Sequence, residues 1–280
     1  MKLSKISERV FANTAGETGG NVGIILLEDF VAAVDAQYPV SGADFRRSIP
    51  SVVSKPVTHL LLTHYHGDHV FGNQAFEDCE IVAHRLLKEL MEANLRSAWA
   101  NVEEMLEEVQ KTRPEKAWLY QGLKIVLPTR VFEKRFALNG VEMIHMGGHT
   151  AGSSVILVPD DRILFAGDLV FAKRFPWGGD PSADPDLWIQ AFKTILDMDA
   201  ETIVPGHGPP CDKSEVKIHL EWFEAIREEM KRLIADGVSI EEAAEHEGYP
   251  DFYDVEAGER RDETLKHWYH VWSRGSSRVT

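Results

Sequence analysis

Short apolar runs separated by polar residues predict β-strands in the first third of the chain. Residues 22–27 and 30–34 are apolar and rich in β-branched side chains, and the two acidic residues between them predict a hairpin. The run 57–63 is almost continuously apolar, as expected for a strand that is buried on both faces. Such a sheet needs helices on its outer face.

The middle of the chain changes to a helical period. Between residues 86 and 109, apolar side chains recur every three or four positions with Glu and Lys between them, which predicts a long amphipathic helical region. Because strand-like runs lie on both sides, we interpret residues 85–118 as a helical insertion. Besides the runs already described, the strand-like runs are residues 80–83, 123–127, 141–144, 154–158, 162–166 and 202–204.

Helical signals dominate the last third of the chain. Asp184 followed by Pro185 predicts an N-cap and the first position of a helix. Beyond residue 212 the apolar positions keep helical spacing, and residues 239–242 fit a capping box. The last aromatic stripe, interpreted as exposed, would either close a pocket or form a homo-oligomer contact; it consists of Trp268, Tyr269 and Trp272.

This order of elements predicts a mixed α/β protein and not a repeat protein. All strand-like runs fall within residues 1–212, which we expect to form the catalytic, metal-binding domain. Residues 213–280 are expected to form a helical C-terminal extension.

Composition and charge restrict the class of partner. The 280 residues are 44% hydrophobic and 27% charged, as in ordinary folded proteins. The net charge of −15 repels phosphate backbones and anionic lipid head groups, so we expect a small-molecule substrate, no nucleic acid and no membrane. Neither a signal peptide nor an apolar run of about 20 residues is recognisable, which predicts a cytoplasmic protein. The two cysteines, far apart in sequence, suggest neither a disulfide framework nor a thiolate metal site.

The candidate chemistry begins directly after the apolar run 57–63. The segment His64-Tyr65-His66-Gly67-Asp68-His69 places three imidazoles and a carboxylate within six positions. Such crowding is electrostatically and sterically awkward without a cation. The segment therefore predicts a metal site.

Three later strand-like runs also end in a glycine followed at once by a ligand-type side chain, namely His149, Asp168 and His207. In sheets covered by helices, strand ends carry functional residues, and glycine permits a sharp turn or a close approach to a ligand. The four strand ends together supply five histidines and two aspartates, enough for two metal positions. Imidazole nitrogen and carboxylate oxygen suit zinc, iron or manganese, and zinc is our first choice.

The order of these seven residues resembles the metallo-β-lactamase superfamily of metallohydrolases, over roughly residues 10–212. The matching positions are His64, His66, Asp68, His69, His149, Asp168 and His207. The resemblance implies an α/β fold, an αββα sandwich of two mixed β-sheets flanked by helices. It also implies a metal site at one edge of the packed sheets.

Carried over to this sequence, the resemblance implies two metal sites that share one carboxylate. The first would consist of His64, His66 and His149. The second would consist of Asp68, His69 and His207, with Asp168 in the bridging position. An aspartate there resembles glyoxalase II, lactonases and phosphodiesterases, whereas true zinc β-lactamases have a different residue. The chain lacks a recognisable C-terminal lysine and arginine pattern for glutathione.

The function implied is hydrolysis of a small ester, thioester, lactone or phosphoester by a hydroxide that two divalent ions activate. Zinc lowers the pKa of bound water to about 7, which makes such a nucleophile available at neutral pH. Asp68 is the candidate catalytic residue, because a carboxylate there can orient the nucleophile and later handle a proton.

Substrate contacts are expected from two further places. A loop with two cations and two aromatic side chains would suit an anionic or aromatic substrate; it holds Lys173, Arg174, Phe175 and Trp177. Alternatively, these aromatic rings cover the core and the cations are solvated. His84 ends the run 80–83 at what we expect to be the same edge of the sheet.

Three other functions remain open from the sequence. A mononuclear iron enzyme resembling persulfide dioxygenases would use His64, His66 and His149 alone. A nuclease resembling the transfer-RNA 3′-processing enzymes is disfavoured by the net charge of −15. A noncatalytic binding protein with a metal kept for stability is disfavoured because a structural zinc site is usually single and closed.

Overall fold

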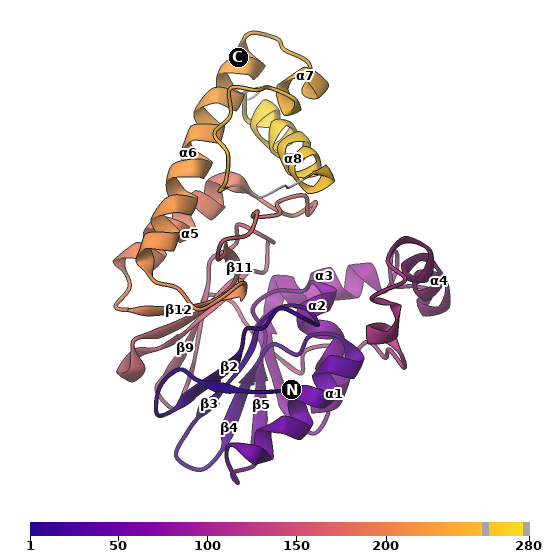
Figure 1. Ribbon diagram of the computed structural model, residues 1–280, viewed down its shortest axis with the longest axis vertical. Coiled ribbons are helices and arrows are strands. Elements are labelled where there is room, and N and C mark those ends of the chain that lie inside the picture. The colour runs from indigo at the N-terminus through magenta and orange to yellow at the C-terminus, as the bar shows by residue number, and fades with distance from the viewer. Residues whose placement is uncertain (254–257, 277–280) are drawn as a thin grey trace.

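Two β-sheets packed face to face form the centre of the molecule, and helices cover their outer faces. The computed structural model describes residues 1–253 and 258–276 (Figure 1). The strand order is β1-β2-β3-β4-β5-β6-β7 in the first sheet and β12-β11-β10-β9-β8 in the second. Buried side chains from both sheets meet between them, among them Ile25, Leu61, Met143 and Phe165. The predicted αββα sandwich is confirmed.

The first sheet is antiparallel from β1 to β4 and parallel from β4 to β7. Its strands are β1 (Ser4–Lys5), β2 (Val10–Asn13), β3 (Val22–Leu26), β4 (Val31–Val34), β5 (Val57–Leu61), β6 (Glu80–His84) and β7 (Arg130–Phe132). The predicted hairpin is β3 with β4. The helices of this half are α1 (Pro39–Ser48), α2 (Gly67–Val70), α3 (Arg85–Asn94) and α4 (Val102–Thr112), with 3-10 turns η1 (Ile49–Ser51), η2 (Phe71–Phe76) and η3 (Ala117–Tyr120).

The second sheet is antiparallel from β8 to β11, and β12 pairs parallel with β11. Its strands are β8 (Arg135–Leu138), β9 (Val141–His145), β10 (Ser154–Val158), β11 (Ile163–Phe171) and β12 (Thr202–His207), with the 3-10 turn η4 (Pro159–Asp161). The β11–β12 ladder is irregular, with register shifts on either side of Gly167. This irregularity falls next to a predicted metal ligand.

One prediction about the middle of the chain was wrong. Residues 123–127 form no strand; their apolar side chains pack on the core, but pairing with β6 begins only at Thr129, whose N–H donates to Ile81 O at 2.9 Å. Pro128 cannot donate to a ladder, which explains the late start. The predicted amphipathic helical region consists of two helices, because Asn101 caps a new helix by accepting from the N–H of Glu104.

The helices of the last third of the chain form one group, in which the first two contact β11 and the last two pack on the second helix (Figure 1). They are α5 (Pro185–Asp197), α6 (Lys213–Ala235), α7 (Ile240–Ala244) and α8 (Glu259–Ser276). Asp184 caps α5 by accepting from two backbone N–H groups, and Ser239 with Glu242 forms the capping box of α7, as predicted. No helix within residues 1–253 and 258–276 is both long and apolar enough to cross a bilayer.

The aromatic stripe of α8 is buried, so its interpretation as exposed was wrong. Trp268 is fully buried, with ring centroids 4.6 Å from Phe223, 5.9 Å from Trp222 and 6.4 Å from Trp188. These rings belong to one hydrophobic cluster with β11 and α5. The stripe therefore joins the helical extension to the second sheet. Division of the chain at residue 212 stays a prediction.

Replacing Trp268 with alanine should lower the free energy of unfolding by about 3–5 kcal/mol, because the indole leaves a cavity inside this cluster. Urea denaturation followed by circular dichroism measures the change. Trp118→Ala removes the same side chain from a site that is 53% exposed, and should cost less than about 1 kcal/mol. Equal losses for both variants would contradict the packing of α8 described here.

Candidate metal centre

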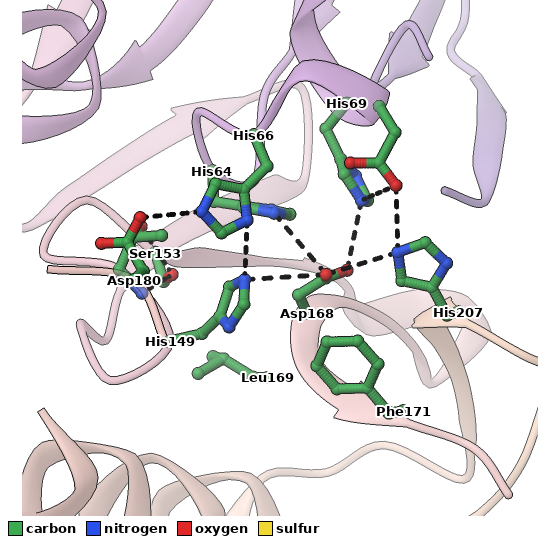
Figure 2. Close-up of polar contacts among 12 residues, drawn as sticks. His64, His66, His69, His149, Ser153, Asp168, Leu169, Phe171, Asp180 and His207 are labelled. Atoms are coloured by element: carbon green, nitrogen blue, oxygen red, sulfur yellow. Dashed lines mark hydrogen bonds and ion pairs between the residues drawn. The ribbon is translucent and has the colours of Figure 1, made fainter. Parts of the chain in front are cut away.

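Side chains from both sheets converge at the carboxyl ends of their strands. His64 and His66 lie in the loop after β5, and His69 lies in the short helix α2. His149 comes from the β9–β10 loop, and His207 is the last residue of β12. Figure 2 shows these imidazoles around the carboxylate of Asp168. Asp168 lies within β11 and not at its end, because this strand continues to Phe171 beyond the irregularity at Gly167, where φ is +52°.

The first group of side chains that could hold a metal ion is His64, His66, His149 and Asp168. Asp168 Oδ2 lies 3.8 Å from Nε2 of His64 and 3.6 Å from Nε2 of His149. Nε2 of His149 lies 3.0 Å from Nδ1 of His66. Nε2 of His64 is buried and has no hydrogen-bond partner among the described residues. These nitrogen and oxygen atoms therefore point at one common centre.

The second group is Asp68, His69 and His207. Nε2 of His207 lies 3.2 Å from Asp68 Oδ2 and 3.4 Å from Asp168 Oδ2. Nε2 of His69 lies 3.2 Å from Asp168 Oδ1. Asp168 thus contacts both groups, as the sequence predicts for a bridging carboxylate.

The spacing of these atoms fits tetrahedral metal sites. Four ligands that bind zinc at about 2.0–2.1 Å lie about 3.3 Å from one another. The contacts within the two groups span 3.0–3.8 Å, apart from 4.0 Å between Nε2 of His69 and Asp68 Oδ2. Together with the buried nitrogen of His64, which has no hydrogen-bond partner among the described residues, this spacing indicates that each group could hold a metal ion.

Burial and the charges of neighbouring side chains shift the pKa values of the cluster in opposite directions. Burial lowers the pKa of His64 well below its usual value and that of His149 to about 3. At His207 burial acts in the same direction, but the carboxylates of Asp168 and Asp68 outweigh it and raise the pKa to about 9. The pKa of Asp168 itself is held well below its usual range, against the effect of burial, by His207 and His69. The buried carboxylates therefore stay ionised only beside positive charge.

Close approach of the chain to these ligands depends on two glycines. A Cβ at Gly206 would overlap Oδ1 of Asp168 and lie 2.6 Å from its backbone nitrogen. A Cβ at Gly20 would overlap the imidazole of His69. The chain can approach the cluster at both places, in β12 and in the loop before β3, only because these positions carry no side chain.

Sequence reasoning missed Asp35, which orients two of the histidines. Its Oδ2 accepts from Nδ1 of His69 at 2.8 Å and from the hydroxyl of Thr63 at 2.7 Å, and its Oδ1 accepts from the N–H of Thr63. The Thr63 hydroxyl lies 3.1 Å from Nδ1 of His64. The sequence did contain a signal for Asp35, because this carboxylate directly follows the apolar run 30–34.

Sequence reasoning also missed Asp180. Nε2 of His66 donates to Asp180 Oδ2 at 2.9 Å, which fixes the ring so that Nδ1 faces the cluster. The hydroxyl of Tyr65 donates to the same oxygen. Asp180 is far from His66 in sequence and follows no recognisable motif, so nothing in the sequence pointed to it.

One side of the cluster is open. The side chains of Asp68, His207 and His66 are 22%, 18% and 16% exposed, whereas those of His64, His69, His149 and Asp168 are at most 5% exposed. A substrate would therefore approach across Asp68, His207 and His66.

The predicted substrate loop divides into residues with different surroundings. Lys173 and Arg174 are exposed. Phe175 is buried, with its ring 5.5 Å from Trp222. The half-buried Trp177 lies closest to the metal cluster, with its ring centroid 5.4 Å from that of His66. Substrate binding by these four residues stays a prediction.

His84 is buried and stacked on His145, with ring centroids 3.6 Å apart and an angle of 4° between planes. Its Nε2 donates to Glu133 O at 2.7 Å, and its Nδ1 accepts from the N–H of Leu86 as the cap of α3. Both ring nitrogens of His84 are therefore engaged in hydrogen bonds to nearby backbone groups. Contact between His84 and substrate stays a prediction.

Replacing Asp35 with asparagine should weaken metal binding at the second group about 10- to 100-fold, because the neutral amide has one acceptor oxygen where Asp35 uses two. Competition with a chromophoric chelator measures the affinity. Asp44→Asn, which alters an exposed ion pair with Arg47, serves as the control. Equal affinities in both variants would contradict an orienting role for Asp35.

The metal-free protein should lose stability in acid partly through His84. Burial lowers its pKa from 6.5 to about 4, so the folded form favours the neutral ring. This contribution is complete above pH 6.5 and is lost as the pH falls towards 4, at a cost of up to about 3 kcal/mol. His84→Asn keeps a capping acceptor without a titrating group, so its unfolding in chelator should depend less on pH. If the free energy of unfolding of His84→Asn depends on pH as steeply as that of wild type and of the exposed control His270→Asn, the contribution of His84 is contradicted.

Comparison with known proteins agrees with this geometry. The family model described as the Metallo-beta-lactamase superfamily matches residues 15–207, a range that contains all seven residues of the two groups. The match ends at the last residue of β12, before α6 begins.

Curated relatives are distant in sequence. The 2,4-dinitroanisole O-demethylase subunit alpha of Nocardioides sp. is 26% identical, over 86% of this chain and 65% of that protein. The beta-lactamase-like protein 2 homolog of Caenorhabditis elegans is 23% identical, over 66% of this chain and 52% of that protein. A hydroxyacylglutathione hydrolase of Rhizobium johnstonii is 28% identical, over 78% and 75%. The chain thus spans less than two thirds of the first two of these relatives.

Solved structures share the fold. A metallo-beta-lactamase from Pontibacter korlensis superimposes with a TM-score of 0.62 at 22% identity, covering 80% of this chain and 98% of that one. A second, from Hirschia baltica, gives a TM-score of 0.58 at 18% identity, covering 77% and 94%. Since the family model matches more than half of the sequence and these folds agree, the chain belongs to the metallo-beta-lactamase superfamily.

Proposed function

We propose that this protein is a hydrolase in which two divalent ions activate water against a small ester, thioester, lactone or phosphoester. The observation that carries the proposal is the position of Asp168 Oδ2, which lies within 3.4–3.8 Å of His64, His149 and His207. One carboxylate shared by two ligand groups is what a dinuclear hydrolytic site needs. A structural zinc site would need only one closed set of four ligands.

The residues that would hold the ions are those of the two groups. His64, His66 and His149 would hold the first, Asp68, His69 and His207 the second, and Asp168 both. When bound, the ions would supply a hydroxide nucleophile at neutral pH and polarise the oxygen of the scissile carbonyl or phosphoryl group. Zinc suits this nitrogen and oxygen donor set best, and iron or manganese would also fit it.

Asp68 is the residue we assign to proton transfer. Its carboxylate is the most exposed of the cluster and lies 3.2 Å from Nε2 of His207, so one oxygen can face the substrate while the other stays on the ligand side. Positive charge from His69 and His207 outweighs burial and lowers the pKa of Asp68 below its usual value. The ionised carboxylate can take a proton from the attacking water and pass it to the leaving group.

Two positioning contacts hold the histidines in the required orientation. Asp180 accepts from Nε2 of His66, and Asp35 accepts from Nδ1 of His69, so in each ring the other nitrogen points at the cluster. The names of the relatives, which include a hydroxyacylglutathione hydrolase and metallo-beta-lactamases, support hydrolysis as the reaction class. The small-molecule substrate, the lack of nucleic acid and membrane partners, a homo-oligomer and the cytoplasmic location stay predictions.

Elemental analysis of the purified protein should find about two zinc, iron or manganese ions per chain. In His66→Ala the first ion should be lost. Turnover across a panel of thioesters, lactones and phosphodiesters should fall at least about 100-fold, because removal of a metal ligand should reduce activity at least as much as removal of a residue that orients a ligand. His246→Ala, on the helical extension, is the matched control, because its ring pairs with Glu229 and Tyr249 and with no metal-group residue in the part of the chain that the structure describes.

Two results would overturn the proposal. One iron per chain with oxygen uptake on thiol or persulfide substrates would identify a mononuclear dioxygenase. Two ions per chain with no turnover across the panel would favour a metal-stabilised binding protein.

A further inference from the structure

Side chains of the C-terminal helices hold the segment that follows Asp168. The N–H of Phe171 donates to Nε2 of His219 at 3.2 Å, and the N–H of Lys173 donates to Glu215 Oε1 at 3.0 Å. Both acceptors are buried and belong to α6, and the hydroxyl of Tyr253 donates to the second oxygen of Glu215. The chain leaving the metal cluster is thus fixed to the helical extension.

The next residues of this segment are held by α8. The indole N–H of Trp177 donates to Glu263 Oε2 at 2.9 Å, and the N–H of Gly178 donates to the buried hydroxyl of Thr264 at 2.9 Å. A Cβ at Gly178 would lie 2.7 Å from Nε1 of Trp268, so the backbone packs directly on α8. Glu263 and Thr264 therefore determine where the indole of Trp177 lies.

That indole stands against two residues of the first metal group. Its ring centroid lies 5.4 Å from that of His66, at an angle of 57°, and 6.3 Å from that of His149, at 68°. Trp177 is half-buried, and the side chain of His66, which its ring contacts, is 16% exposed. A group bound at the first metal position would meet this ring.

Aromatic rings also stand beside the second group. A Cβ at Gly19 would lie 3.3 Å both from the ring of Tyr38 and from Cβ of Asp68, so the phenol is separated from this carboxylate only by the glycine. The ring of Tyr120 lies 4.7 Å from that of Tyr38. Both tyrosines are buried, at 8% and 6% exposure. Aromatic side chains therefore pack beside Asp68 as well as beside His66, but only Trp177 is partly exposed.

We propose that α8 sets the substrate preference of this enzyme: Glu263 and Thr264 hold Trp177 as a wall beside the metal cluster, and this wall selects substrates with a planar aromatic group next to the scissile bond. The inference rests on the proposed hydrolytic site. Aromatic rings in offset or edge-to-face contact attract each other beyond their shared apolar area, which a saturated ring of equal size cannot reproduce. Trp177 is the specificity-determining residue, and Glu263 and Thr264 are positioning residues.

Binding of two matched thiols tests the wall without any need for a known substrate. Phenylmethanethiol and cyclohexylmethanethiol carry the thiol on the same CH2 group and differ in aromaticity, and Trp177→Ala separates the ring contact from any difference in thiol acidity. Isothermal titration of the zinc-loaded protein should show about 3- to 10-fold tighter binding of the aromatic thiol. Trp177→Ala should abolish this preference with zinc content unchanged, and Trp177→Phe should retain most of it. Trp118→Ala, an exposed tryptophan, is the matched control.

The role of α8 is tested by two variants of one residue. Glu263→Ala removes the acceptor of the Trp177 indole and should reduce the preference, whereas Glu263→Gln keeps an acceptor oxygen and should restore it. On a turnover substrate with an aromatic group, Glu263→Ala should raise KM and leave kcat nearly unchanged, since Glu263 touches no metal ligand.

The outcomes separate this inference from the proposed function. Equal affinity of the two thiols for wild type, or a preference that survives Trp177→Ala, overturns the aromatic wall even if the protein binds two ions and hydrolyses esters. A preference that Glu263→Ala leaves intact overturns the positioning by α8. Loss of turnover with an intact thiol preference would instead count against the hydrolytic function alone.

Discussion

The buried carboxylate of Asp168 is the constraint on which the rest of this site depends. An ionised carboxylate without water around it is stable only beside compensating charge or donors. Here four imidazoles lie within 3.8 Å of its oxygens, two from each metal group. Because Asp168 contacts both groups, the positions of the two groups cannot vary independently. The relative position of the two sheets is therefore restricted at this point.

The local irregularity of β11 makes this placement possible. Gly167 takes a left-handed conformation within the strand, and Asp168 follows it where the ladder with β12 shifts register. β12 approaches from the other side through Gly206, and the ring of Phe171 stacks on His207 at an angle of 9°. A regular parallel ladder would place successive side chains on alternate faces. The shifted ladder brings Asp168 and His207 to the same place.

The helical extension is part of the architecture of the site and not an appendage. Its rings share a hydrophobic cluster with β11 and α5, and its polar side chains bind the backbone that leaves the metal cluster. Changes on α6 or α8 can thus reach the site through fixed contacts, without touching a metal ligand. In a fold that many hydrolases share, such peripheral helices are a natural place for specificity to differ.

The sequence by itself determined a mixed α/β protein and the seven converging residues, and the resemblance that those residues carry implied the sandwich fold and the family. The signals are local: short apolar runs, and ligand-type side chains that follow a strand or a glycine directly. Only the tertiary structure decided the roles of Asp35 and Asp180, which bond histidines 34 and 114 residues away. It also decided that residues 123–127 form no strand and that Trp268 is buried. Local periodicity states which face of an element is apolar, but the partner across that face depends on how distant segments pack.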